Sequence, residues 1–266
     1  MEYHPLYGPS VTEKAWVPAP SFLLRRDRIL RLMSDCRPGR LLEIGCGAGT
    51  ILHELSRRKF ICEALETSPA ALDVATHVNG DDVTFHKEAK SDWRERFDYV
   101  LAFEVLEHIE FDRKALMDWY GWIKPGGTIL ISVPAHMKKW TASDVWAGHY
   151  RRYEMQQIKD LLMVVGFEIE KIETYGFPLS NILLPLRARV HARNLSDAAS
   201  SNARATNNDR SGVERGTESR LYPVLRSLPG LMAMRLALLL QHHSRSKDWG
   251  TGYLLLAKKP QAGTPQ

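Results

Sequence analysis

The sequence predicts an α/β fold in which one doubly wound sheet of seven strands is mostly parallel, with an antiparallel last strand. Three observations predict it. Short apolar runs alternate with helical stretches from Arg40 onward. A glycine-rich turn follows the first of these runs directly. The length of 266 residues and the hydrophobic fraction of 44% suit a single large domain with a packed core.

The first 39 residues come before that alternation begins. Met1 to Pro20 combine aromatic residues with several prolines and show no period, which predicts an ordered arm or lid. A helix is expected next, because an approximate helical stripe of apolar residues follows Ser21, which can cap the helix, and precedes Pro38 and Gly39, which stop it.

The alternation itself gives the elements of the core. The helix at Glu154 to Val165 has the clearest spacing, because its apolar residues form one face and Gly166 ends it. The other expected helices follow Gly49, follow Ser68-Pro69, and span Asp112 to Trp122. The expected strands are Leu41–Ile44, Ile61–Glu66, Val83–His86, Tyr99–Phe103, Thr128–Val133, Phe167–Ile172 and Gly252–Ala257.

Two stretches before the last strand depart from this rhythm. Residues 187–220 are polar and poor in large apolar side chains, which predicts a mobile insertion. Residues 221–243 are apolar and predicted to be helical, packing back on the domain or facing a lipid or a partner protein. One domain is therefore expected over residues 1–266. Its parts are the arm and first helix (1–39), the core (40–180), the insertion (181–248), and the last strand and tail (249–266).

The glycine-rich turn indicates a ligand. Gly45, Gly47 and Gly49 stand at alternate positions between a strand and a helix. Glycines let the backbone turn tightly and let a ligand approach main-chain N–H groups at the positive end of the helix. The dinucleotide fingerprint would need glycine or alanine at position 50, where this chain has Thr50. The turn therefore predicts a nucleotide-type cradle and disfavours NAD.

Further motifs follow in a fixed order. Glu43 precedes the glycine turn, Glu66 ends the second expected strand, and the strings 97–109 (FDYVLAFEVLEHI) and 123–134 (IKPGGTILISVP) come next. Together they resemble the class I S-adenosylmethionine-dependent methyltransferases of the small-molecule, methyltransferase-11 or UbiG-like type. The resemblance covers about residues 40 to 175 and the final strand. It implies a Rossmann-like fold, an enzyme, and S-adenosyl-L-methionine as the cofactor.

The resemblance also implies contacts to that cofactor. The glycine turn would face its methionine half, with Glu43 near the ammonium, and Glu66 and Thr67 would hold the ribose. Residues after the third strand would flank the adenine, where Glu88 replaces the usual Asp. The implied set is Glu43, Gly45, Cys46, Gly47, Gly49, Glu66, Thr67, Glu88, Ala89, Phe103 and Glu104.

The acceptor side is expected in residues 134–153, beyond the carboxyl end of the fifth strand. Methyl transfer needs positioning and, for a protonated nucleophile, a base. His149 is the first candidate base, with His136 second and Asp144 a further proton acceptor; for each histidine, orienting the loop is the alternative role. The candidate acceptor-binding residues are Trp140, Trp146, Tyr150, Arg151 and Tyr153. We expect a small, partly apolar acceptor methylated on oxygen or nitrogen.

Two interpretations of the arm remain open at this point. Tyr7 and Trp16 either fold over the site or pack on the edge of the domain. His108, which follows the fourth strand, is expected to begin a helix and to have a structural role.

The net charge and one local motif bear on the alternative functions. The net charge of +5 arises largely between Arg187 and Arg245 and raises the alternative of an RNA or tRNA methyltransferase. Against it, Phe103 to Leu106 lack the Asn/Asp-Pro-Pro-aromatic string common in enzymes that methylate base amines, so no nucleic acid is expected. A non-catalytic interaction subunit, with 221–243 as its contact surface, is the other alternative.

The three cysteines form no CxxC pair, which argues against a disulfide framework and a structural zinc site, and no metal is expected. The chain shows no export signal and no spanning segment, so a cytoplasmic protein is expected, with peripheral membrane contact through 221–243 open.

Overall fold

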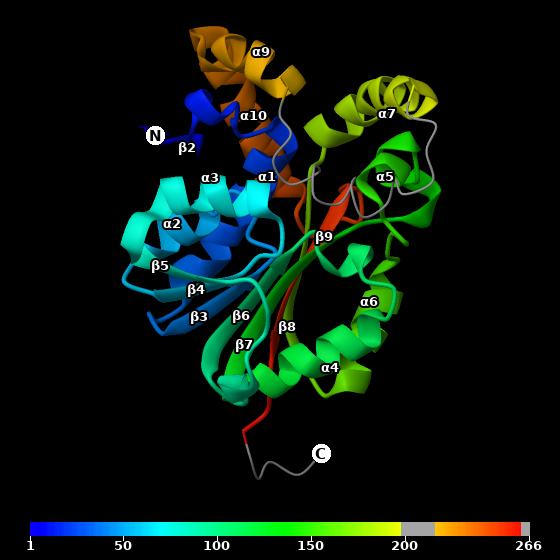
Figure 1. Cartoon of the computed structure of the whole chain (residues 1–266). Coiled ribbons are helices and arrows are strands. Elements are labelled where there is room, and N and C mark those ends of the chain that lie inside the picture. Colours follow the sequence, from blue (N-terminus) through cyan, green and yellow to red (C-terminus); the bar gives the residue numbers. More distant parts are fainter. Residues whose placement is uncertain (198–215, 262–266) are drawn as a thin grey trace.

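A seven-stranded mixed sheet forms the centre of the molecule (Figure 1). The computed structural model describes residues 1–197 and 216–261. The sheet has the order β5-β4-β3-β6-β7-β9-β8, and β9 pairs antiparallel with both of its neighbours. This confirms the predicted sheet and its antiparallel last strand. The strands are β3 (Arg40–Ile44), β4 (Ile61–Leu65), β5 (Val83–His86), β6 (Phe97–Phe103), β7 (Ile123–Pro134), β8 (Glu168–Tyr175) and β9 (Gly252–Lys258).

The strand order reverses direction next to β3. The chain moves outward from β3 to β4 and β5, then returns to place β6 on the other side of β3, parallel to it. In doubly wound sheets the loops at the carboxyl ends of the two strands beside such a reversal move apart and leave a crevice. The turn after β3 and the loop after β6 therefore border the expected binding position.

Helices cover both faces of the sheet (Figure 1). α1 (Pro20–Leu32), α2 (Thr50–Ser56) and α3 (Pro69–Asn79) lie on one face, and α4 (Asp112–Trp122) and α6 (Met155–Val165) on the other. Successive strand residues such as Leu41 and Leu42 enter the two opposite cores, because side chains alternate along a strand. Burial on both faces explains why the central strands are continuous apolar runs.

The N-terminal arm contains structure that its composition did not predict. β1 (Glu2–His4) and β2 (Gly8–Ser10) form an antiparallel ribbon. Ala19, and not Ser21, is the N-cap of α1, and Pro20 occupies the first turn. The expected Ser21 cap is therefore wrong, because proline has a suitable φ and lacks the N–H that a cap would satisfy.

The segment before β9 is largely helical where it is described. α7 (Leu179–Asp197) includes the first part of the stretch predicted to be a mobile insertion, and α9 (Gly216–Arg226) includes its end; the prediction for 198–215 lies outside the described residues. The apolar stretch forms the end of α9 and all but the last residue of α10 (Leu228–Ser244). The two helices meet at Ser227, the N-cap of α10. No helix in the two described ranges is both long and apolar enough to cross a bilayer.

α9 and α10 return to the N-terminal region (Figure 1). Tyr222, Met234 and Ala237 pack in one cluster with Tyr7 and Leu24, so α9 and α10 hold the arm and α1. α5 (Ala142–Ala147) lies beside α7, and the rings of Trp146 and His191 stack with centroids 4.3 Å apart. The remaining short 3₁₀ turns are η1 (Thr12–Lys14), η2 (Met33–Asp35), η3 (Gly80–Asp82), η4 (Ser91–Trp93), η5 (Leu106–His108) and η6 (Met137–Lys139).

Candidate active site

The turn between β3 and α2 has the backbone that its glycines predict. Gly45, Gly47 and Gly49 have φ values of +64°, +54° and +66°, in the left-handed region that other residues rarely occupy. A Cβ atom on Gly49 would lie 2.6 Å from Nδ2 of Asn79. Gly49 is the N-cap of α2, so the turn presents backbone N–H groups at the positive end of that helix.

Glu66 holds this turn against the neighbouring strand. Its Oε2 accepts a hydrogen bond of 2.9 Å from the Gly47 N–H, and its Oε1 accepts one of 2.9 Å from the Ser68 N–H. Each carboxylate oxygen keeps a second lone pair. Glu66 does not line the cavity described below, and neither do Gly49, Thr67, Glu88 or Ala89; the last three are exposed.

Glu43 and Arg25 both line the cavity beside the turn, and the Arg25 guanidinium acts electrostatically on the Glu43 carboxyl. Glu43 is only 3% exposed, and its Oε2 has no hydrogen-bond partner in the described part of the chain. Burial raises the pKa of the Glu43 carboxyl well above its ordinary value, against the opposing effect of Arg25. The Arg25 Nε also lacks a partner among the residues described. Both residues line the cavity, and each keeps a buried polar atom without a partner among residues 1–197 and 216–261.

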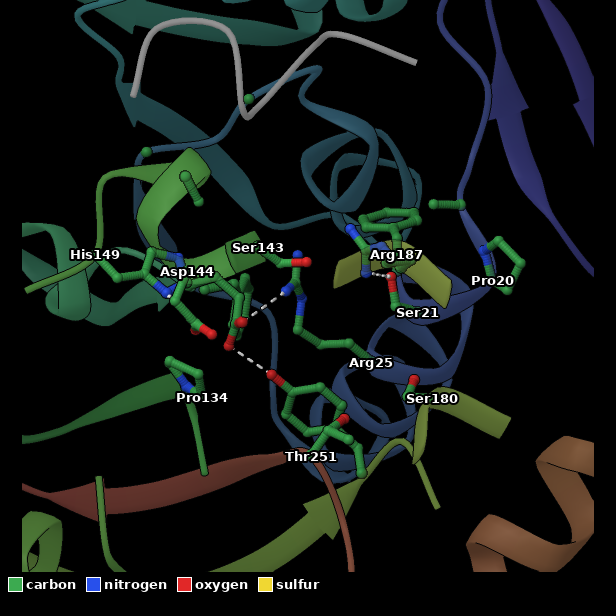
Figure 2. Close-up of a pocket in the computed structure, with 18 of the residues that line it drawn as sticks. Pro20, Ser21, Arg25, Pro134, Ser143, Asp144, His149, Ser180, Arg187 and Thr251 are labelled. Carbon is green, nitrogen blue, oxygen red and sulfur yellow. Dashed lines mark hydrogen bonds and ion pairs between the residues drawn. The ribbon is translucent and has the colours of Figure 1, made fainter. Parts of the chain in front are cut away.

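A cavity of about 310 Å³ extends from the glycine turn to α5 and α7. Figure 2 shows His149 and Asp144 on one side, Ser21 and Arg187 on the other, and Arg25 between them. Of the predicted cofactor residues, those that line it are Glu43, Gly45, Cys46, Gly47, Phe103 and Glu104. The predicted acceptor-side residues that line it are Asp144, Trp146 and His149. The structure thus brings both predicted halves of the site to one space.

Asp144 and His149 form an ordered pair at the acceptor side. His149 Nδ1 lies 3.0 Å from Asp144 Oδ1. The Arg152 guanidinium donates to both oxygens of Asp144, at 2.7 and 3.0 Å, and the Thr141 N–H donates at 2.8 Å. Burial would raise the pKa of Asp144, but the bonds from His149 and Arg152 lower it to about 2. Asp144 is therefore an ionised anchor that orients His149.

Glu104 closes the cavity between these two halves. It has a φ of +57°, an uncommon conformation for a residue with a side chain. Its Oε1 accepts hydrogen bonds from the Tyr175 hydroxyl at 2.5 Å and the Ser132 hydroxyl at 3.2 Å, and Arg25 Nη1 lies 3.7 Å from its Oε2. The strain at Glu104 is thus compensated by a defined set of partners.

The other predicted acceptor-side residues lie away from the cavity. His136 is buried, with Nδ1 3.3 Å from Glu154 Oε2 and Nε2 3.2 Å from Asp248 Oδ1. Tyr153 is fully buried and donates to Asp112 Oδ2 at 3.0 Å, and Arg151 pairs with the same carboxylate. Trp140 and Tyr150 are also absent from the lining.

The N-terminal arm and α7 supply further lining residues. Trp16 reaches the cavity from the arm, which answers the question left open for that residue, whereas Tyr7 packs with α9 and α10. One face of α7 contributes the residues Ser180, Leu183, Leu184, Arg187 and His191. Their helical spacing was readable in the sequence, but Pro185 and the polar residues beyond it concealed the helix.

Comparisons with known proteins agree with this geometry. Residues 21–172 match the family model described as a methyltransferase domain. A ubiquinone biosynthesis O-methyltransferase from Alkalilimnicola ehrlichii is 31% identical over 117 residues, which cover 41% of this chain and 47% of that protein. The chain thus spans about half the length of the curated relatives that it matches.

Solved structures share the fold. An S-adenosylmethionine-dependent methyltransferase from Mesorhizobium loti has a TM-score of 0.53 at 15% identity, covering 90% of this chain and 98% of that one. Phosphoethanolamine N-methyltransferase 2 from Haemonchus contortus, solved with S-adenosyl-L-methionine, has a TM-score of 0.54 at 21% identity, covering 89% and 52%.

The residues present fit S-adenosyl-L-methionine. The amino-acid end of that molecule carries an ammonium and a carboxylate, and the cavity is lined by Glu43 and Arg25, each of which has an unpartnered polar atom in the part of the chain that the structure describes. The glycine turn offers N–H groups next to them. Since the match covers more than half of its length, the chain belongs to the methyltransferase domain family.

Proposed function

We propose that this protein transfers the methyl group of S-adenosyl-L-methionine to a hydroxyl oxygen of a small, partly apolar acceptor. The observation that carries the proposal is a single cavity with the glycine turn at one side and the His149–Asp144 pair at the other. The matched relative from Alkalilimnicola ehrlichii is named an O-methyltransferase, which favours oxygen over nitrogen as the attacked atom.

At the cofactor end, residues of the chain bind and orient S-adenosyl-L-methionine. Glu43 accepts from the ammonium and Arg25 pairs with the carboxylate, so Glu43 Oε2 and Arg25 Nε each gain the partner that they lack among the described residues. Glu66 uses its remaining lone pairs for the ribose hydroxyls, and Thr67 lies beside it, while Glu88 and Ala89 flank the adenine beyond the cavity. When bound, the cofactor supplies a methyl group that its sulfonium already activates.

At the acceptor end, His149 removes a proton from the acceptor hydroxyl. The Asp144 carboxylate accepts the Nδ1–H of His149, which leaves the lone pair on Nε2 as the base. Asp144 is a positioning residue in this scheme, because two bonds from Arg152 keep it ionised and fixed. His136 takes no part, since its ring is enclosed outside the cavity.

Apolar side chains from three separate elements select the body of the acceptor. Phe22 from α1, Trp146 from α5, and Leu183 and Leu184 from α7 line the same space. Stacking against His191 fixes the Trp146 ring as a wall. These surfaces suit an aromatic or aliphatic acceptor.

The test uses matched acceptors and labelled cofactor. The protein is incubated with methyl-labelled S-adenosyl-L-methionine and either phenols and catechols or aromatic amines of the same shape, and the products are identified by mass. The proposal expects label on oxygen, lost in His149→Gln while calorimetry still detects S-adenosylhomocysteine binding. Binding of the cofactor with no transfer to any acceptor in a wider metabolite extract would instead support a non-catalytic subunit.

We also propose that α10 contacts a lipid surface. An exposed apolar stripe runs along this helix through Leu228, Met232, Leu236 and Leu239, and the exposed Arg235 adds positive charge beside it. Such contact would bring an apolar acceptor near the cavity. Flotation with anionic vesicles should recover the protein, and Leu236→Ser with Leu239→Ser should reduce recovery several-fold; Met163→Ser, an exposed apolar residue on α6, is the control. Equal flotation of all three proteins would refute the contact.

A further inference from the structure

Three side chains of the kinds that bind metal ions meet beside the cavity, and none of them belongs to the predicted cofactor-binding set. Glu107 and His108 belong to η5, just after β6, and His149 follows α5. One donor atom from each of the three lies within 4.8 Å of the other two. Glu107 Oε1 is 3.9 Å from His149 Nε2, and the rings of His108 and His149 meet edge to face at 4.7 Å. His108 and His149 also line the cavity.

The cluster contains polar atoms without partners. Glu107 is completely buried, and neither of its carboxylate oxygens has a hydrogen-bond partner within residues 1–197 and 216–261. His108 Nδ1 is likewise unpartnered in those ranges. Removing a carboxylate from water without giving it a partner is costly, so buried carboxylates in native proteins are normally paired or hydrogen-bonded. A cation bound between Glu107 and His108 would give these unpartnered atoms a partner.

We propose that Glu107, His108 and His149 bind one divalent first-row transition metal ion, for which Zn²⁺ is the first choice. Two imidazole nitrogens and one carboxylate oxygen are a donor set that zinc sites with an open position use. Magnesium and calcium prefer oxygen ligands and fit this set less well. The absence of CxxC pairs, from which the sequence predicted no metal, does not bear on a site built from histidine and glutamate.

The surroundings of His149 are those of a metal-binding histidine. A ligating histidine almost always donates its other ring N–H to a carboxylate or a carbonyl group. Here Asp144 Oδ1 lies 3.0 Å from His149 Nδ1, and Arg152 and Thr141 fix Asp144 in place. This leaves Nε2 on the side of Glu107. Donor atoms around a tetrahedral ion lie about 3–3.5 Å apart, so the side chains need to close by at most about 1.5 Å.

The ion would face the acceptor half of the cavity. An open position on it would take the acceptor hydroxyl and lower the pKa of that group, so that its proton passes to water as it binds. With the ion bound, His149 Nε2 is a ligand, and the ion takes the place of the free base described above. This second step rests on the proposed function. Binding of the ion does not rest on it and is measured without any acceptor.

The experiment titrates chelator-treated, tag-free protein with ZnCl₂ in a calorimeter, with native mass spectrometry to count ions. One ion per chain is expected. Glu107→Gln and His108→Gln should each weaken binding beyond the roughly 10- to 100-fold that loss of an outer partner costs. His77→Gln, which removes a histidine on the surface, should bind as the wild type does. No bound ion, or unchanged affinity in Glu107→Gln, would overturn the site.

Two further measurements separate the site from folding and from the reaction. Thermal melts of the metal-free variants show whether they fold, and Co²⁺ loading should give the visible absorption of a low-coordinate site in the wild type but not in Glu107→Gln. Methyl transfer that is unaffected by removal of the ion would overturn its role in the reaction. Failure to transfer methyl groups with the ion bound would count against the proposed function and not against the site.

Discussion

Replacing Glu43 by glutamine should weaken binding of the cofactor and, at the same time, stabilise the free protein. Glu43 is 3% exposed and its Oε2 is unpartnered within the described residues, so an incoming ammonium gains one charge-assisted hydrogen bond there. Such bonds contribute about 1.5–3 kcal/mol. Because about 1.4 kcal/mol corresponds to a factor of ten, Glu43→Gln should weaken S-adenosylhomocysteine binding roughly 10- to 150-fold.

The effect on the free protein has the opposite sign and a defined pH window. Burial raises the pKa of Glu43 in the folded protein above its value in the unfolded chain. Its contribution to stability is therefore complete below about pH 4.3 and is lost as the pH rises through the folded pKa. Glu43→Gln avoids that loss. Its free energy of unfolding should exceed that of the wild type at pH 8, and the difference should shrink toward pH 4.

Glu63 is the matched control, on the strand next to β3. It is equally buried, but burial is outweighed by hydrogen bonds from His86, Arg96 and Arg40, which lower its pKa. Its contribution to stability is thus present above about pH 4.3 and lost as the pH falls through the lowered folded pKa. Glu63→Gln should destabilise the protein at pH 8 by about 1.5–3 kcal/mol.

The assays are calorimetry with S-adenosylhomocysteine and urea unfolding of the free protein at pH 5 and pH 8. Glu63→Gln should retain the cofactor affinity of the wild type while losing stability, the reverse of Glu43→Gln. If Glu43→Gln binds the cofactor as tightly as the wild type does, the carboxylate does not face the ammonium and the orientation assigned to the cofactor is wrong.

Three other substitutions follow from the same site. His149→Gln should lower kcat by about 10²–10⁴-fold while cofactor binding persists, measured by label transfer and calorimetry; an unchanged kcat would exclude a role in proton removal. Asp144→Asn should cost about 3–5 kcal/mol in urea unfolding at pH 7, since it leaves buried Arg152 unpaired, and the stabilisation by Asp144 should disappear as the pH falls from about 4 to about 2. Gly49→Ala should cost about 1–3 kcal/mol in the same assay, because its φ is +66° and its Cβ would meet Asn79, whereas unchanged stability would mean that the turn rearranges freely.

The sheet and the glycine turn could be predicted because their signals are local. Apolar runs of strand length mark the buried strands, and a helical period marks α4 and α6. At the turn, the backbone itself requires glycine: three positive φ values within five residues leave little choice of residue type. Cys46 lies in the same turn. Burial raises the pKa of its thiol well above the ordinary value, so the thiol is not activated as a nucleophile.

The acceptor half was predictable only in part. His149, Asp144 and Trp146 reached the cavity because the chain after β7 passes over the end of the sheet. His136 comes from the same segment and shares its composition, yet its ring is enclosed with Asp248, which lies more than a hundred residues away in the sequence. Composition cannot distinguish the two histidines, since the direction of each ring depends on its distant neighbours.

By itself, the sequence determined the alternation of strands and helices, the cradle and the class of ligand that it holds, since each depends on residues adjacent in the chain. Only the tertiary structure decided that Arg25 and Trp16 enter the cavity, that one face of α7 covers it, and that Glu107, His108 and His149 converge. The physical reason is that a binding site is formed by contacts between residues distant in sequence, and their side chains meet only once the packed layers have fixed the distances between them.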